Sequence, residues 1–353
     1  MFTRRCASAL ALLLALMLSA CGSKATPSAQ APVPAPTAGS TTAPTVALST
    51  SALPAAPTAA PIAPPAEAPT VATATGVTVT DVAGRKVTVA ATPQRIISLA
   101  PSDTEILFAL DLGPKVVAVD DFSDYPPDVK NLPKIGGTNA SYNFEQIVAL
   151  KPDLILAAGI TPPEAIKKLE DLKQTVIVLG TAQTTFASIS ADIALVGEVT
   201  RQADKARQVT DAMQQKLEAI KARVATAKTR PRVYWELDAT DPAKPYSVGP
   251  GNFVSDLIAM AGGTNIFENV SAPFPQISSE QVVAADPEVI ILSDAAYGIT
   301  VDSVAKRPGW QALAAVTHQR VAPIDDNLVS RPGPRIVEGL EAVAKIIHPE
   351  LFT

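Results

Sequence analysis

The longest stretch with a helical pattern of apolar residues covers residues 201–228. It contains no Gly and no Pro, and its apolar residues recur at steps of three or four: Ala206, Val209, Met213, Leu217, Ile220, Val224 and Ala227. This spacing predicts one apolar stripe on a helix roughly 40 Å long, about the width of a domain. Gly197 before it and Pro231 after it are stop signals. We therefore expect a strut between two globular halves.

The same short pattern stands on both sides of the predicted helix. Residues 145–149 read Glu-Gln-Ile-Val-Ala and 152–156 read Pro-Asp-Leu-Ile-Leu, while 280–284 and 287–291 read Glu-Gln-Val-Val-Ala and Pro-Glu-Val-Ile-Ile. We interpret each copy as a short helix, a Pro-marked turn and a buried strand. A weaker echo pairs residues 105–110 with 256–261. Glu-Gln-aliphatic text is common in helices, but the matching spacing favours two similar lobes.

Short aliphatic runs and helical patterns alternate through both halves. An alternating pattern predicts a β-hairpin over 77–89. Buried strands are expected at 96–100, 116–119, 154–158 and 176–179, and again at 233–237, 289–292 and 321–324. Helices are expected at 104–110, 144–150, 255–261 and 335–347. The predicted fold class is α/β: two Rossmann-like lobes joined by one long backbone helix, with a ligand cleft between the lobes.

The first 75 residues predict export and anchoring. Arg4 and Arg5 precede an apolar run, residues 7–20, that is too short to span a membrane. Leu-Ser-Ala-Cys at 18–21 resembles the bacterial lipobox, which implies lipidation of Cys21. The alternative is an ordinary secreted protein, but Cys6 lies in the removed part, which leaves Cys21 without a disulfide partner. We expect an extracytoplasmic protein held to the cell membrane by a lipid anchor.

Composition then divides the chain. Eleven prolines between positions 27 and 69, with almost no charge, predict a tether that cannot form a core. The expected parts are a signal peptide (1–20), a lipidated Cys and tether (21–75), an N-terminal lobe (76–184), connecting helices (185–230) and a C-terminal lobe (231–353).

Charge and residue usage exclude several function classes. The net charge is −5 and no basic run occurs, so we expect no nucleic-acid partner. His318 and His348 fall in no metal-ligand or triad spacing, so we expect neither an enzyme nor a metal site. No Gly-Lys-Ser/Thr loop is present to cradle phosphates.

Several motifs carry a resemblance that covers nearly all of the chain from about residue 77. They are the two Glu-Gln units and residues 95–105, 123–127 (Ser-Asp-Tyr-Pro-Pro), 274–278 (Phe-Pro-Gln-Ile-Ser) and 331–336. The chain resembles the helical-backbone class of periplasmic substrate-binding proteins of ABC importers, which handle cobalamin, ferric siderophores and haem. Segments 123–127 and 274–278 are most similar to cobalamin-binding members. The resemblance implies a monomer with little lobe closure that delivers a corrinoid to a permease dimer with its ATPase.

Two other functions stay open: delivery of a ferric siderophore or haem by the same route, and a scaffold lipoprotein that transports nothing. No cofactor is expected other than the transported ligand.

The ligand residues follow from the same resemblance. Tyr125 and Phe274 match the family's ligand-contacting aromatics, one on each lobe, and a ring with a phenol donor suits a flat macrocycle with amide arms. Arg331 matches an arginine that donates to ligand amides or phosphate. Cobalamin binders have Trp in place of Asn139 and Asp in place of Asn327, which leaves a related corrinoid or a different chelate open.

Three more aromatic residues are candidates for the cleft. Tyr142 is a candidate to replace the missing Trp ring. Trp235 and Tyr246 lie at and after a strand end that faces the cleft, and the pattern leaves Trp235 open between core and cleft. Arg335 is expected to be structural.

Glu145 and Glu280 open the two copies of the repeat. By resemblance, they are the glutamates that engage arginines of the permease, and a symmetric charge pair suits a two-fold partner. The alternative is that both are ordinary helix-start glutamates stabilised by the helix dipole.

Overall fold

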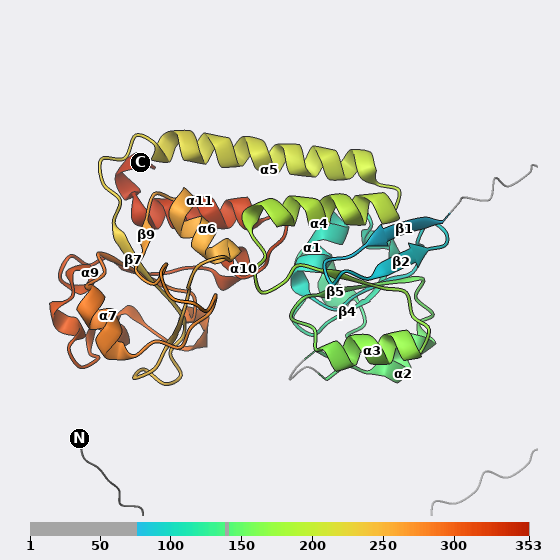
Figure 1. The fold of residues 1–353 in the computed structure, drawn as a ribbon, viewed down its shortest axis with the longest axis horizontal. Helices are drawn as coiled ribbons and strands as arrows, with labels where there is room; N and C mark the ends of the chain where they lie inside the picture. The colour runs from blue at the N-terminus through green and yellow to red at the C-terminus, as the bar shows by residue number, and fades with distance from the viewer. Residues whose placement is uncertain (1–75, 138–140, 353) are drawn as a thin grey trace, which may run out of the picture. The chain divides into compact units, whose positions relative to one another are not determined.

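The computed structural model describes residues 76–137 and 141–352, all of which belong to one compact unit (Figure 1). The predicted signal peptide, Cys21, the tether and Asn139 lie outside the described residues. Two α/β lobes are joined by helices, which confirms the predicted fold class.

The N-terminal lobe is built on a parallel sheet. Its strands are β3 (Ile96–Ser98), β4 (Val116–Val119), β5 (Leu154–Ala158) and β6 (Val176–Leu179), in the order β4-β3-β5-β6. Most of their residues are buried because helices cover the sheet: α1 (Pro101–Ala109), α2 (Phe144–Ala149) and α3 (Pro163–Asp171). The hairpin of β1 (Val77–Thr80) and β2 (Lys86–Val89) precedes them as predicted.

The C-terminal lobe has a mixed sheet. Its order is β11-β10-β7-β8, with β9 also on β7; the strands are β7 (Arg232–Asp238), β8 (Tyr246–Ser247), β9 (Thr264–Asn265), β10 (Val289–Leu292) and β11 (Val321–Pro323). β8 runs antiparallel to β7, and the other pairs are parallel. Its α-helices are α6 (Phe253–Met260), α7 (Ser279–Ala285), α8 (Val301–Ala305), α9 (Ala314–Thr317), α10 (Asp326–Val329) and α11 (Ile336–Ile347). Single 3₁₀ turns over both lobes are Gly113–Lys115, Pro127–Asn131, Ala295–Tyr297, Trp310–Ala312 and Pro349–Leu351.

Two helices connect the lobes. α4 (Phe186–Val199) is followed by α5 (Ala203–Val224), whose 22 residues give a length of about 33 Å. α5 lies across both lobes (Figure 1). Its Lys205 Nζ is 2.6 Å from Asp111 Oδ2 of the N-terminal lobe, and its Lys216 Nζ is 3.0 Å from Glu341 Oε2 on α11.

The prediction that Gly197 is a stop signal before the long helix was wrong. Gly197 lies inside α4 and does not end a helix. A Cβ atom on Gly197 would be 2.5 Å from the Ala206 Cβ, so glycine allows α4 and α5 to approach closely. The break falls instead at Arg201, which has a φ of 62°.

A continuous apolar cluster links the lobes. It includes Ile96 and Leu154 of the first sheet, Leu217 of α5, and Val233 and Trp235 of the second sheet. Smaller clusters cover the other faces of the two sheets. The connecting helices are therefore packed into the cores that they join.

The predicted repeat is present in the structure. α2 leads to β5 and α7 leads to β10, as the two Glu-Gln units predict. Asn143 and Ser278 cap these helices by accepting a hydrogen bond from the third helical residue. Lys151 and Asp286, each six residues after the repeat's glutamate, have φ of 49° and 42°. The two copies thus share their backbone turn as well as their sequence.

Candidate ligand-binding cleft

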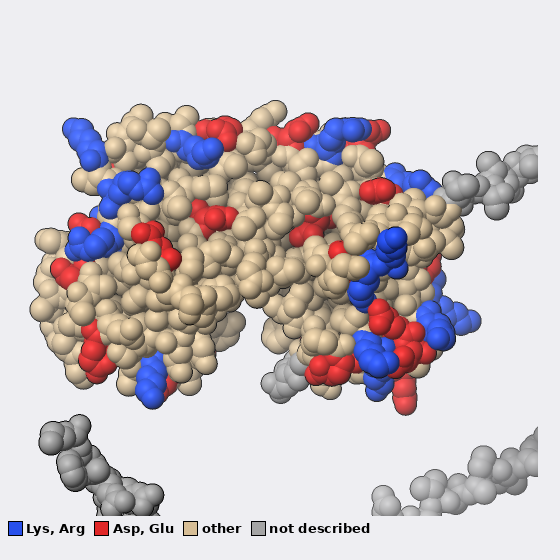
Figure 2. All heavy atoms as spheres, viewed as in Figure 1, with Lys and Arg blue, Asp and Glu red and all other residues tan. Residues whose placement is uncertain are grey.

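A cavity of about 400 Å³ lies between the lobes. The N-terminal lobe contributes the start of α1 and the residues after β5 and β6, including Ile160 and Thr181. The C-terminal lobe contributes Phe253, Phe274 and Arg331. The carboxyl ends of parallel strands are the usual place for a ligand in α/β proteins. On the side away from α5, a notch separates the lobes in the space-filling view (Figure 2).

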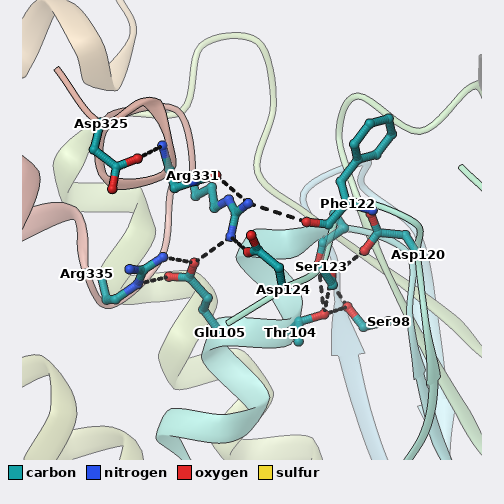
Figure 3. Close-up of polar contacts among 12 residues, drawn as sticks. Ser98, Thr104, Glu105, Asp120, Phe122, Ser123, Asp124, Asp325, Arg331 and Arg335 are labelled. Carbon is teal, nitrogen blue, oxygen red and sulfur yellow. Dashed lines mark hydrogen bonds and ion pairs between the residues drawn. The ribbon is translucent and has the colours of Figure 1, made fainter. Parts of the chain in front are cut away.

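Arg331 crosses from one lobe to the other. Its Nη1 is 2.7 Å from Asp124 Oδ1 and 3.3 Å from Glu105 Oε1, both on the N-terminal lobe (Figure 3). Its Nη2 donates to the side-chain oxygen of Asn327, one turn earlier. Asn327 and Arg331, two of the predicted ligand residues, therefore contact each other at the boundary of the lobes.

Arg335 makes a second bridge to the same carboxylate. Its Nε is 3.0 Å from Glu105 Oε2 and its Nη2 is 2.6 Å from Glu105 Oε1. The guanidinium also stacks on Tyr125, with 3.7 Å between its central carbon and the ring centroid. Tyr125 is thus held in place by the other lobe. We name Glu105, Asp124, Arg331 and Arg335 the inter-lobe charge cluster.

The remaining aromatic candidates lie on both lobes. Phe274 is 37% exposed and lines the cavity. Tyr246 is exposed on β8, and its backbone forms a bridge with Gln276 beside Phe274. Tyr142 is half-buried, edge-on to Phe144 with 6.4 Å between ring centroids. Burial raises the pKa of the Tyr142 phenol, and the negative charges of Asp120 and Asp103 raise it further.

The structure places Trp235 in the core, not at the cleft. Its side chain is 1% exposed and its Nε1 donates to Ser293 Oγ at 3.1 Å. The sequence left Trp235 open between core and cleft because β7 is covered on both faces. Its neighbours Tyr234 and Glu236 are buried as well. An alternating pattern that distinguishes a cleft face from a core face is therefore missing.

Sequence reasoning missed several residues around the cavity. Asp103 of α1 and Asp192 of α4 line it with buried carboxyl groups. Ile160, which also lines it, is 85% exposed, and Phe122 is exposed beside the inter-lobe charge cluster. Asp103 lies within the 95–105 motif, but six of the eleven residues there are polar and Glu105 is acidic too, so its charge was no distinct signal. Ile160 and Phe122 had no signal beyond their place after a strand.

Glu145 and Glu280 occupy equivalent places on the two lobes. Each is exposed in the first turn of its helix, α2 or α7. Both helices lie on the side of their lobes away from α5 (Figure 1). Hydrogen bonds from its own backbone amide and from Ser278 lower the pKa of Glu280. Neither glutamate lines the cavity between the lobes.

Two α/β lobes with a cavity between them, packed onto a long connecting helix, define a two-lobed solute-binding protein. The chain belongs to the periplasmic binding protein family, whose profile matches residues 96–328. It is 33% identical to the ABC transporter substrate-binding lipoprotein YvrC of Bacillus subtilis (strain 168) over 78% of this chain and 87% of the relative. It is also 33% identical to a vitamin B12-binding protein of Vibrio cholerae, over 71% of this chain and 87% of that protein.

Solved structures have the same fold. The periplasmic vitamin B12-binding protein BtuF of Vibrio cholerae matches with a TM-score of 0.63 and 31% identity, covering 73% of this chain and 98% of that one. The periplasmic haem-binding protein RhuT of Roseiflexus sp. RS-1 matches with a TM-score of 0.63 and 26% identity, covering 73% and 99%. The resemblance stated from the motifs is confirmed.

Family membership sets the general role of the chain. It is a solute-binding protein of the ABC import type, a class that binds small ligands outside the cytoplasm and works with a permease and an ATPase. Within residues 76–137 and 141–352, no helix has the length and apolar character needed to cross a bilayer. The same residues hold no group of three or more His, Cys, Asp or Glu side chains suited to a metal ion.

Proposed function

We propose that this protein captures a corrinoid outside the cytoplasmic membrane and delivers it to an ABC importer. The observation that carries the proposal is the cavity between the lobes, where aromatic rings and hydrogen-bonding side chains meet. Phe274 and Arg331 line it. Arg331 shares the Glu105 carboxylate with Arg335, and the Arg335 guanidinium stacks on Tyr125. The similarity to vitamin B12-binding proteins supports the same ligand class.

Two parts of a corrinoid, the flat macrocycle and its amide arms, have suitable partners here. The flat faces of the macrocycle match the rings of Tyr125, Phe274 and, at the rim, Tyr246. Arg331 and Asn327 supply donors and an acceptor for amide arms. Tyr142 is not among the residues that line the cavity, and it stays a predicted contact, as does Asn139. Trp235 supports the strand from within the core instead of touching the ligand.

A haem or a ferric chelate is the second candidate. It is favoured by the exposed apolar side chains of Phe122 and Ile160, which would suit a porphyrin face, and by similarity to haem-binding proteins such as RhuT. The corrinoid is preferred because the relatives named for vitamin B12 are more similar in sequence.

Delivery requires an anchor and a docking face. Cys21 would carry the lipid, and the Pro-rich tether would let a monomer turn toward its permease. Glu145 and Glu280 would dock on arginines of the permease dimer. Both are exposed, and their equivalent places in the two lobes suit a two-fold partner.

Visible absorption spectroscopy tests the ligand class. The purified protein is mixed with cyanocobalamin, dicyanocobinamide, haem or a ferric siderophore and then dialysed. The proposal predicts a retained corrinoid spectrum. A retained haem or ferric-chelate band would select the second candidate, and no retained ligand would favour a scaffold lipoprotein.

A further inference from the structure

A buried carboxyl group of α1 faces the cavity with one oxygen unused. Asp103 is 1% exposed and lines the cavity. Its Oδ1 accepts a hydrogen bond from Ser102 Oγ at 3.2 Å, whereas its Oδ2 has no hydrogen-bond partner among the described residues. A buried polar atom left without a partner costs about 1–3 kcal/mol. Such an atom on the wall of a binding cavity indicates a place where a ligand group completes the hydrogen bonding.

A second carboxyl group lines the same cavity. Asp192 comes from α4 and is also buried. Burial raises its pKa to about 6, against the opposing effect of a hydrogen bond from the backbone of Gly180. Burial likewise raises the pKa of Asp103 well above its usual range; the Ser102 hydroxyl opposes this, and the charges of Asp192 and Asp120 add to it.

The other charged groups nearby are already paired. Arg331 lines the cavity, but its guanidinium is bound to Glu105 and Asp124. Asp120 accepts from Ser123 Oγ, and Lys134 donates to the backbone oxygens of Asp120 and Ser123. The negative charges of Asp103 and Asp120 raise the pKa of the Tyr142 phenol, so the phenol is uncharged. An anionic ligand group would thus meet two acids and a cation that is already neutralised.

We propose that Asp103, with Asp192 on the same cavity, is the specificity-determining contact for a primary carboxamide arm of the transported ligand. A protonated carboxyl group donates its O–H to the amide oxygen and accepts from the amide N–H, so the two groups form a pair of hydrogen bonds. A carboxylate arm can accept the O–H, but it has no N–H for the second hydrogen bond, and its negative charge would lie on the same cavity as the Asp192 carboxyl group. The apolar lining, including Ile106, Leu179 and Phe253, suits the methylenes of such an arm. This inference rests on the proposed corrinoid function and deepens it.

The test compares amide and carboxylate arms on one macrocycle. Titration calorimetry at pH 7, with the full chain in detergent, measures the affinity for cyanocobalamin and for its monocarboxylates, in which one propionamide is hydrolysed. For the wild type, we expect at least one monocarboxylate to bind 30-fold or more weakly than the parent. D103L should weaken parent binding at least tenfold and reduce the discrimination to threefold or less.

D103N is neutral and keeps one donor and one acceptor, as a protonated carboxyl group does, so it should bind the parent within about threefold and still reject the carboxylate. D294N is the matched control: Asp294 is buried with an unpartnered oxygen, but it does not line this cavity. Its discrimination should equal that of the wild type.

Three results would overturn the inference. One is unchanged discrimination in folded D103L. Another is tighter binding of a corrinoid whose arm ends in an ammonium group, because that would require an ionised acid pair. The third is wild-type binding with no preference between parent and monocarboxylates, which would leave the corrinoid function standing. No binding of any corrinoid by the wild type would instead overturn the proposed function, and this inference with it.

Discussion

Replacing Glu105 by Gln should destabilise the protein strongly, because one buried carboxylate serves two arginines of the other lobe. The Glu105 side chain is 2% exposed, and those of Arg331 and Arg335 are 11% and 16% exposed. Gln has nearly the same volume but no charge, and its NH₂ group would face guanidinium donors. The substitution therefore isolates the ionic contribution from packing.

The size of the effect follows from burial. Removing one partner of a buried ion pair costs about 3–5 kcal/mol, because the other charge stays buried. Arg331 keeps Asp124, and Arg335 keeps its contact with Tyr125, so the lower end applies: about 3 kcal/mol. For a domain of this size, this corresponds to a fall in Tm of roughly 6–12 °C.

Urea unfolding followed by circular dichroism measures this loss, and D124N is the control. The Asp124 side chain is 50% exposed, so its ion pair with Arg331 is worth at most about 1 kcal/mol. A loss below 1 kcal/mol for E105Q, or an equal loss for D124N, would refute the claim that the buried carboxylate holds the lobes together.

The other predictions concern ligand, pH, anchor and docking. F274A and Y125A should each weaken ligand binding by on the order of 2 kcal/mol in calorimetry; wild-type affinity in both would move the site elsewhere. The pKa of Asp192 is raised to about 6 in the folded state, so the contribution of Asp192 to stability falls as pH rises from about 4 to 6. D192N should lack that fall and gain up to about 3 kcal/mol above pH 7; parallel pH curves would contradict the shift. C21S should be released from membranes in a host that lacks the permease, with unchanged ligand affinity; continued membrane association would refute the anchor. The E145A/E280A double variant should bind ligand normally yet lose more uptake than either single variant, and charge reversal to Lys should be worse; full uptake would make both residues simple helix starts.

Elements with a strong local pattern could be predicted from the sequence. The strands at 116–119, 154–158, 176–179 and 289–292 have the observed bounds, because these buried aliphatic runs end at Gly or polar residues. The Glu-Gln repeat also predicted the α2–β5 and α7–β10 units, since spacing and capping residues are local features. The short strands β8 and β9 had weak patterns and were not assigned; α3 was not assigned either, although Ala165, Ile166 and Leu169 follow a helical spacing.

The site depended on contacts between distant residues. Glu105 pairs with arginines 226 and 230 positions further along the chain, which a pattern within one segment cannot reveal. Gly197 looked like a helix stop because its role, close approach to Ala206, exists only once α4 and α5 pack together. The resemblance brought Tyr125, Asn327 and Arg331 forward as ligand residues, while Asp103 and Asp192 emerged only from their shared cavity.

Uptake of radiolabelled cyanocobalamin tests the proposed function most directly. The measurement uses proteoliposomes that contain the cognate permease and its ATPase, with and without this protein. We predict ATP-dependent uptake that requires the protein and is reduced by excess unlabelled corrinoid but not by haem. Uptake that is independent of the protein, or that is blocked by haem alone, would contradict corrinoid delivery.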